Sequence, residues 1–240
     1  MITALAVGQP GLAAWSFAAA ALCVFLAHEP LLILIGHRGP RPQRERQDEA
    51  VRWFAAFATV GAALGVIAFV LMEPLARLAT MAPAVLALVL VALIFARSER
   101  TTLGEAMTAI TLASVAIPVA IAADASTTTA LTCAAAFAAG FVAATVCVRA
   151  VIAHTRNPPA ARARTTAIAA TLAVLSILVS LGSGELIAWV APWAAAPLIL
   201  GAIALAAVPP SARHLRIVGW TLVATTAATS LVLIAALRYY

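Results

Sequence analysis

Long runs of apolar residues dominate the chain, and short polar segments separate them. Each run is close to the ~20 residues that an α-helix needs to cross the hydrocarbon core of a bilayer. Strands of a membrane barrel would alternate apolar and polar residues, whereas these runs are continuous. The pattern predicts transmembrane helices over residues 9–27, 53–72, 78–96, 103–122, 128–150, 166–183, 186–207 and 216–237.

Composition supports a membrane environment for nearly the whole chain. Of its 240 residues, 64% are hydrophobic and only 10% are charged, against about 25% charged in a soluble domain. Unpaired backbone groups in hydrocarbon cost several kcal/mol each, which favours helices over open strands. Because the connecting loops are short, we predict an all-α, polytopic membrane helix bundle of about eight transmembrane helices, with residues 1–240 forming a single integral membrane domain.

The distribution of arginine predicts the orientation. All 15 basic residues are arginine, and 13 of them fall in alternate connecting segments, namely 36–52, 97–102, 149–165 and 208–216. The segments between these carry only Arg77 and Arg238. The positive-inside rule therefore places the four segments on the cytoplasmic side of the membrane. This topology accounts for the net charge of +6. We therefore expect membrane lipids as partners and no binding of nucleic acid.

The absence of lysine has two readings. The planar fork of arginine donors suits phosphate recognition, and an alanine- and arginine-rich genome would produce the same bias.

Three other features concern packing. Gly61 and Gly65 form a GxxxG pair that predicts a close helix contact, and Pro118 predicts a kink in the fourth span. The cysteines, which all lie in apolar runs, are expected to be small packing residues.

One apolar run is interrupted in the segment FLAHEPLLILIGHRGPRPQR, residues 25–44. Pro30 disfavours helical geometry at the residue before it, Glu29. We therefore expect the first span to end at His28–Pro30. The following LLILIG is too short to cross a bilayer, so it is expected to lie at the interface or to re-enter the bundle.

Two later segments carry polar residues at the same predicted membrane depth: RSERTTLGE, residues 97–105, and VRAVIAHTRNPPAARAR, residues 148–164. Together the three segments predict one polar, cytoplasm-facing pocket. Its candidate residues are His28, Glu29, His37, Arg38, Glu105, Arg149, His154, Arg156 and Asn157. Arginine and histidine could hold a phosphate or carboxylate. In the alternative reading, the arginines snorkel to lipid phosphates and only enforce topology.

Ionisable groups near hydrocarbon are costly unless they are paired. Glu29 or Glu105 could act as a general base or pair with Arg149, and we favour a Glu29–Arg149 pair that faces the bundle interior. The sequence has no HExxH, CxxC, Walker-type or GxSxG motif. We therefore predict no metal and no cofactor, and whether the chain is an enzyme stays open.

The segments FLAHEPLLILIGHRG, RSERTTLGE and VCVRAVIAHTR resemble the YwiC-like family of bacterial multi-pass membrane proteins. Similar proteins typically carry a Glu-His-Gly-Ala-aromatic motif on an additional first helix. The resemblance implies that ITALAVG, residues 2–8, corresponds to the tail of that helix. It also implies nine helices in the full-length family, with the first one truncated here.

The helix count and polar loops are also distantly similar in layout to those of UbiA-type prenyltransferases. Those enzymes bind a prenyl diphosphate through magnesium, using two aspartate-rich motifs. The corresponding segments here, 28–41 and 149–157, contain arginine and histidine but no aspartate. The chain thus departs from that pattern in the oxygen ligands that magnesium requires.

Three functions remain open at this point. The first is a cytoplasm-facing pocket that binds an anionic lipid or isoprenoid-like ligand. The alternative is a non-catalytic assembly or interaction subunit with a membrane-protein partner, which the many small residues favour. A small-solute transporter is the third and least favoured function, because the predicted spans lack the charged residues near the membrane midplane that mark transport pathways.

Overall fold

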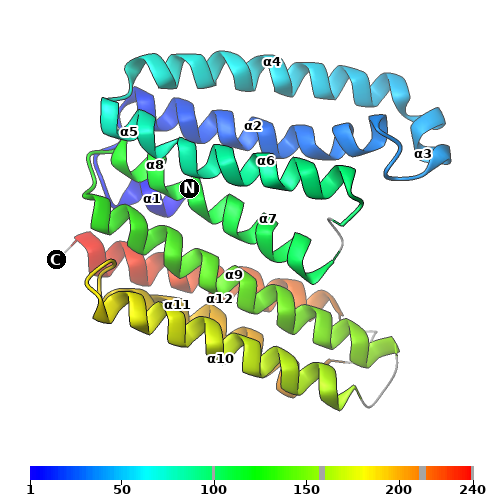
Figure 1. Cartoon of the computed structure of the whole chain (residues 1–240), viewed down its shortest axis with the longest axis vertical. Coiled ribbons are helices and arrows are strands. Elements are labelled where there is room, and N and C mark those ends of the chain that lie inside the picture. The colour runs from blue at the N-terminus through cyan, green and yellow to red at the C-terminus, as the bar shows by residue number, and fades with distance from the viewer. Residues whose placement is uncertain (99–100, 157–159, 211–214, 239–240) are drawn as a thin grey trace.

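The computed structural model describes residues 1–98, 101–156, 160–210 and 215–238, and within them the chain is helical with no strand (Figure 1). The helices are α1 (Ile2–Ala6), α2 (Leu12–Leu34), α3 (Pro40–Glu45), α4 (Gln47–Leu71), α5 (Pro74–Ala79), α6 (Met81–Phe95), α7 (Thr102–Ser114), α8 (Ala116–Ile121), α9 (Thr127–Arg156), α10 (Ala161–Ser183), α11 (Val190–Ala207) and α12 (Leu215–Arg238).

Eight helical stretches in this described part are long and apolar enough to cross a membrane, in the order that the sequence predicts. Two of them are composite, since α5 continues into α6 and α7 continues into α8. The predicted all-α membrane bundle is confirmed, and the chain is a multi-pass membrane protein. Helices α4 and α9 extend several residues beyond the predicted spans, to Gln47 and Arg156.

The predicted kink in the fourth span is a break between α7 and α8. Helix α7 ends at Ser114 and α8 begins at Ala116. Pro118 explains the position, because a proline ring clashes with the carbonyl group four residues earlier and provides no N–H for it. That carbonyl belongs to Ser114, the last residue of α7.

The predicted end of the first span at His28–Pro30 is wrong. Helix α2 continues through Pro30 to Leu34, with Ile35 as its C-cap residue, so residues 31–34 form its last turn rather than a re-entrant segment. Gly36 ends the helix instead, with a φ of +75° that favours glycine. The His37 N–H donates to the Leu32 carbonyl at 2.9 Å, which is the Schellman pattern of a helix C-terminus. One proline near a helix end removes a single backbone bond, and membrane helices tolerate this.

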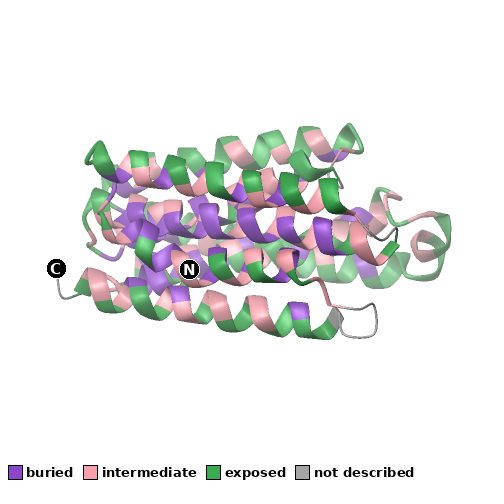
Figure 2. Cartoon of the chain, turned by 90° about the horizontal axis from the view of Figure 1, so that it is seen from below, coloured by how far each residue is buried: buried purple, intermediate pink, exposed green. Residues whose placement is uncertain are grey.

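Helix α9 occupies the centre of the bundle and contacts α7, α8, α10 and α11. Buried residues concentrate on such central helices, while outer helices are largely exposed (Figure 2). The buried side chains of α9 are mostly small, including Cys133 and Cys147 among alanines. Gly140 shows how close the neighbours are, since a Cβ atom there would lie 2.5 Å from Cδ2 of Leu198 on α11.

Helices α2 and α4 pack along each other as a hairpin. A Cβ atom on Gly61 of α4 would lie 3.1 Å from Cβ of Cys23 on α2, whereas a Cβ atom on Gly65 would meet nothing within 4 Å. In the described part of the chain, α2 joins the rest of the core through its first half, with Ala14 and Ala18. The predicted close contact is thus confirmed at the first glycine of the GxxxG pair and is absent at the second.

The connections α2–α4, α6–α7 and α9–α10 lie together at one end of the bundle, on the right of Figure 1. These connections contain the arginine-rich segments 36–52, 97–102 and 149–165, and we call this the arginine-rich end. Not every arginine there faces solvent. Nε of Arg164 donates to the Ala206 carbonyl at 2.9 Å and Nη2 donates to that of Ala207, so this side chain caps the C-terminus of α11.

The two glycines of α4 provide a test of the α2–α4 contact. Gly61→Leu should lower the stability of the protein in detergent by about 1–3 kcal/mol, because a larger side chain must push α2 away. Gly65→Leu is the matched control and should be neutral or slightly stabilising, since glycine weakens a helix interior by roughly 0.5–1 kcal/mol. Thermal unfolding followed by circular dichroism measures both. Equal effects of the two substitutions would contradict this account of the contact.

Candidate functional site

The candidate residues separate into two groups at the arginine-rich end. One group lies where α2 ends and contains His28, Glu29, His37 and Arg38. The other lies where α7 begins and α9 ends and contains Glu105, Arg149, His154 and Arg156. Asn157 lies outside the described residues.

Glu29 and Arg38 form a clamp across the end of α2. Nε of Arg38 donates to Oε1 of Glu29 at 2.8 Å, and Nη2 donates to Oε2. Such paired, charge-assisted contacts match the planar guanidinium to the planar carboxylate. Nε2 of Gln43 donates to the Leu34 carbonyl at 2.9 Å and ties α3 to the same turn. The clamp therefore has a clear structural role in folding the α2–α3 connection back onto α2.

The structure gives Glu29 and Arg149 ion-pair partners other than each other, which corrects the favoured pairing. Glu29 pairs with Arg38, and Arg149 pairs with Glu105. The reason is the continuation of α2 past Pro30. The turn at Gly36 then brings Arg38 back beside the helix, while α6 and α7 lie between α2 and α9 in the view of Figure 1.

The second group begins with the cap of α7. The N–H of Gly104 donates to Oγ1 of Thr101 at 3.1 Å, which satisfies one of the free donors at the start of the helix. The cap places Glu105 in the first turn of α7. There the positive end of the helix dipole stabilises a carboxylate.

Arg149 on α9 reaches this first turn of α7. Its Nη1 lies 3.5 Å from Oε2 of Glu105 and donates to Oγ1 of Thr102 at 3.1 Å. The Arg149 side chain is 36% exposed and that of Glu105 is 41% exposed. A Glu105–Arg149 pair is the second of the pairings that the sequence left open, and the structure confirms it.

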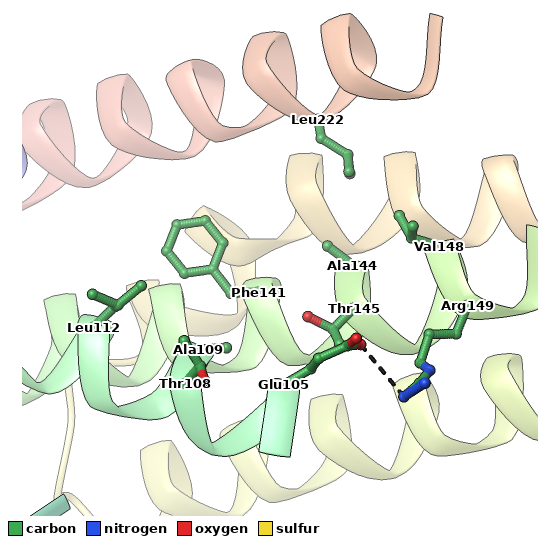
Figure 3. A pocket seen from close by; sticks show the side chains of 10 residues that line it. All are labelled: Glu105, Thr108, Ala109, Leu112, Phe141, Ala144, Thr145, Val148, Arg149 and Leu222. Carbon is green, nitrogen blue, oxygen red and sulfur yellow. Dashed lines mark ion pairs between the residues drawn. The ribbon is translucent and has the colours of Figure 1, made fainter. Parts of the chain in front are cut away.

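A groove of about 510 Å³ runs from this ion pair between α7, α9 and α12 (Figure 3). Its lining residues are Glu105, Thr108, Ala109, Leu112, Phe141, Ala144, Thr145, Val148, Arg149 and Leu222. Glu105 and Arg149 lie at one end of the groove, and Leu112 and Phe141 lie further along it. Apart from Thr108 and Thr145, the groove is thus apolar along its length, and it is charged at its arginine-rich end.

A second hollow of about 540 Å³ adjoins the groove, and Arg149 lines both. Its other lining residues include Arg156, an exposed residue at the end of α9, and Ala160. Among the described residues that line the groove and this hollow, the charged ones are Arg149, Arg156 and Glu105, which together give the mouth a net positive charge.

His154 lies one turn beyond Arg149 towards the end of α9, and its Nδ1 is buried without a hydrogen-bond partner in the described part of the chain. Within that same part, no three histidine, cysteine, aspartate or glutamate side chains are grouped so that they could hold a metal ion.

Sequence reasoning missed several groove residues. The T-x-x-E pattern of Thr102 and Glu105 marks a helix start, but the residue that caps α7 is Thr101, one position earlier. Thr108, Phe141 and Leu222 have no such signal. In a membrane protein, side chains that line an apolar groove have the same composition as those that face lipid.

A double-mutant cycle tests the clamp. Glu29→Gln and Arg38→Gln should each lower stability, and the double mutant should lose less than the sum, with a coupling of about 0.2–1 kcal/mol because both side chains are partly exposed. Glu29→Gln combined with Arg149→Gln should be additive. Thermal unfolding in detergent measures both cycles. Stronger coupling of Glu29 to Arg149 than to Arg38 would restore the pairing that the sequence favours.

Comparison with known proteins gives one match. The model of a family described as YwiC-like protein matches residues 1–120, which is half of the chain. A search of curated proteins and a search of solved structures each gave no match. The matched part includes both Glu29 and Glu105 and confirms the resemblance carried by the segments around them. The chain belongs to the YwiC-like family.

Proposed function

We propose that this membrane protein binds an anionic lipid in the α7–α9–α12 groove, with the lipid head group at Arg149 and its chain along the groove. One observation carries the proposal: an apolar groove that ends at a partly exposed guanidinium. A lipid has the matching arrangement of an apolar chain and a charged head.

The physical chemistry of the groove favours such a ligand. Guanidinium groups bind phosphate oxygens through paired, charge-assisted hydrogen bonds. Arg149 and Arg156 provide these at the mouth. The remaining lining buries an acyl or isoprenoid chain among residues such as Leu112 and Phe141. A volume of about 510 Å³ falls within the roughly 300–1,000 Å³ of small-molecule sites.

The arginine-rich end faces the cytoplasm of a bacterial inner membrane in this proposal. The positive-inside rule supports the orientation, because 11 of the 15 arginines occur in the three segments that define this end. The groove would then receive its ligand from the cytoplasmic leaflet.

Thiol labelling of intact cells tests the orientation. On a background with Cys23, Cys133 and Cys147 replaced by alanine, an impermeant maleimide should label Thr127→Cys and should not label Arg44→Cys until the cells are opened. Both positions are exposed, Arg44 in α3 and Thr127 at the start of α9. Labelling of Arg44→Cys alone in intact cells would reverse the orientation.

Lipid retention tests the binding site. The wild-type protein should retain phosphatidic acid over phosphatidylcholine in native mass spectrometry. Arg149→Gln should weaken that retention about tenfold, since a hydrogen bond to a charged group contributes roughly 1.5–3 kcal/mol. Arg44→Gln, in an exposed segment away from the groove, is the control and should leave retention unchanged.

Equal retention by wild type and Arg149→Gln would contradict the proposal. A protein that is released with a stable protein partner and without bound lipid would also contradict it, and would favour an assembly subunit.

A further inference from the structure

We infer that the groove recognises the ester carbonyl of an acyl lipid through the hydroxyl group of Thr145, one helical turn from the head group. The ligand class is then a phospholipid with ester-linked chains rather than an isoprenyl phosphate. This inference rests on the proposed function and names the ligand class for the same site. It follows from the position of the polar side chains in the groove and from the hydrogen bonds of their hydroxyl groups.

The two threonines of the groove lie next to its charged end. On α9, Thr145 precedes Arg149 by four residues. On α7, Thr108 follows Glu105 by three residues. Residues at these spacings share one face of a helix and lie about one turn of 5.4 Å apart. The threonines therefore form a polar step between the ion pair and the apolar remainder of the groove (Figure 3).

The hydroxyl groups of these two threonines differ in their hydrogen bonds. A threonine in a helix commonly donates its proton to the carbonyl group four residues earlier, and Thr108 donates to Gly104 in this way at 2.9 Å. The Thr145 hydroxyl makes no hydrogen bond within the part of the chain that the structure describes, and in Figure 3 it points away from Arg149. Because a hydroxyl group among apolar side chains costs free energy without a partner, a ligand that supplies an acceptor at Thr145 is favoured.

An ester-linked phospholipid has an acceptor at the matching place. When its phosphate lies at Arg149, the short glycerol backbone follows, and the ester carbonyl at the start of the acyl chain comes level with Thr145. That carbonyl accepts the Thr145 proton, and the chain continues past Leu112 and Phe141. An isoprenyl phosphate has hydrocarbon directly after its phosphate and leaves the hydroxyl without an acceptor.

Two lipids that differ only at the ester test the inference. Ester-linked and ether-linked phosphatidic acid have the same head group and chains of the same length, but the ether form has no carbonyl oxygen. In native mass spectrometry of the purified protein, wild type should retain the ester form over the ether form by about fivefold, the size expected of one hydrogen bond between uncharged groups. Thr145→Val removes the hydroxyl with little change in shape and should lower the preference to about twofold or less. Thr145→Ser keeps the hydroxyl and should keep the preference.

Two controls separate the ester contact from a general effect on the groove. Geranylgeranyl phosphate has no ester, so wild type and Thr145→Val should retain it equally. Thr165→Val is the matched control variant, because Thr165 is exposed on α10 and its hydroxyl donates to carbonyl groups of its own helix. It should keep the wild-type preference for the ester form.

The possible results distinguish this inference from the proposed function. If wild type retains both forms of phosphatidic acid equally, or if Thr145→Val keeps the wild-type preference or loses all three lipids alike, the role of Thr145 is overturned. The binding site still stands in these cases, provided that Arg149→Gln weakens retention. If wild type retains none of the lipids, or if Arg149→Gln retains them as well as wild type does, the site and the role of Thr145 are overturned together.

Discussion

Close packing of small side chains around α9 is the constraint on which the rest of the bundle depends. In a membrane, the lipid tails are as apolar as the side chains, so helices associate through backbone approach and van der Waals contact. Gly140, Cys147 and the alanines of α9 allow this approach to α7, α10 and α11. Larger side chains at these positions would separate the helices that form the groove.

The bundle uses its arginines in distinct ways at one end. Arg38 closes the turn after α2 and Arg164 caps α11, so these two side chains stabilise helix ends. Arg149 differs because it joins two helices through a long, partly exposed ion pair at the end of an apolar groove. Ligand binding in our account depends on that position, since a partly exposed guanidinium at the end of an apolar groove can bind the head group of a lipid whose chain lies along the groove.

The architecture was largely readable from the sequence, whereas the pairing of charged residues was not. Apolar run length and arginine alternation predicted the spans and the arginine-rich end. Pro118 marked a break correctly, but Pro30 did not end its helix, because Gly36 provides a better C-terminal signal six residues later. Because α2 continues past Pro30, Glu29 pairs with Arg38 instead of with Arg149, the partner that the sequence favoured. Contacts such as Thr102 with Arg149 join residues far apart in the chain, and local pattern contains no information on them.

A structure determined by electron cryomicroscopy in nanodiscs that contain phosphatidic acid would test the central claim most directly. The account predicts an elongated density along α7, α9 and α12, with its head within hydrogen-bond distance of the Arg149 guanidinium. Lipid density confined to the outer surfaces of α4 and α6, with α7 and α12 closed over α9, would contradict the account.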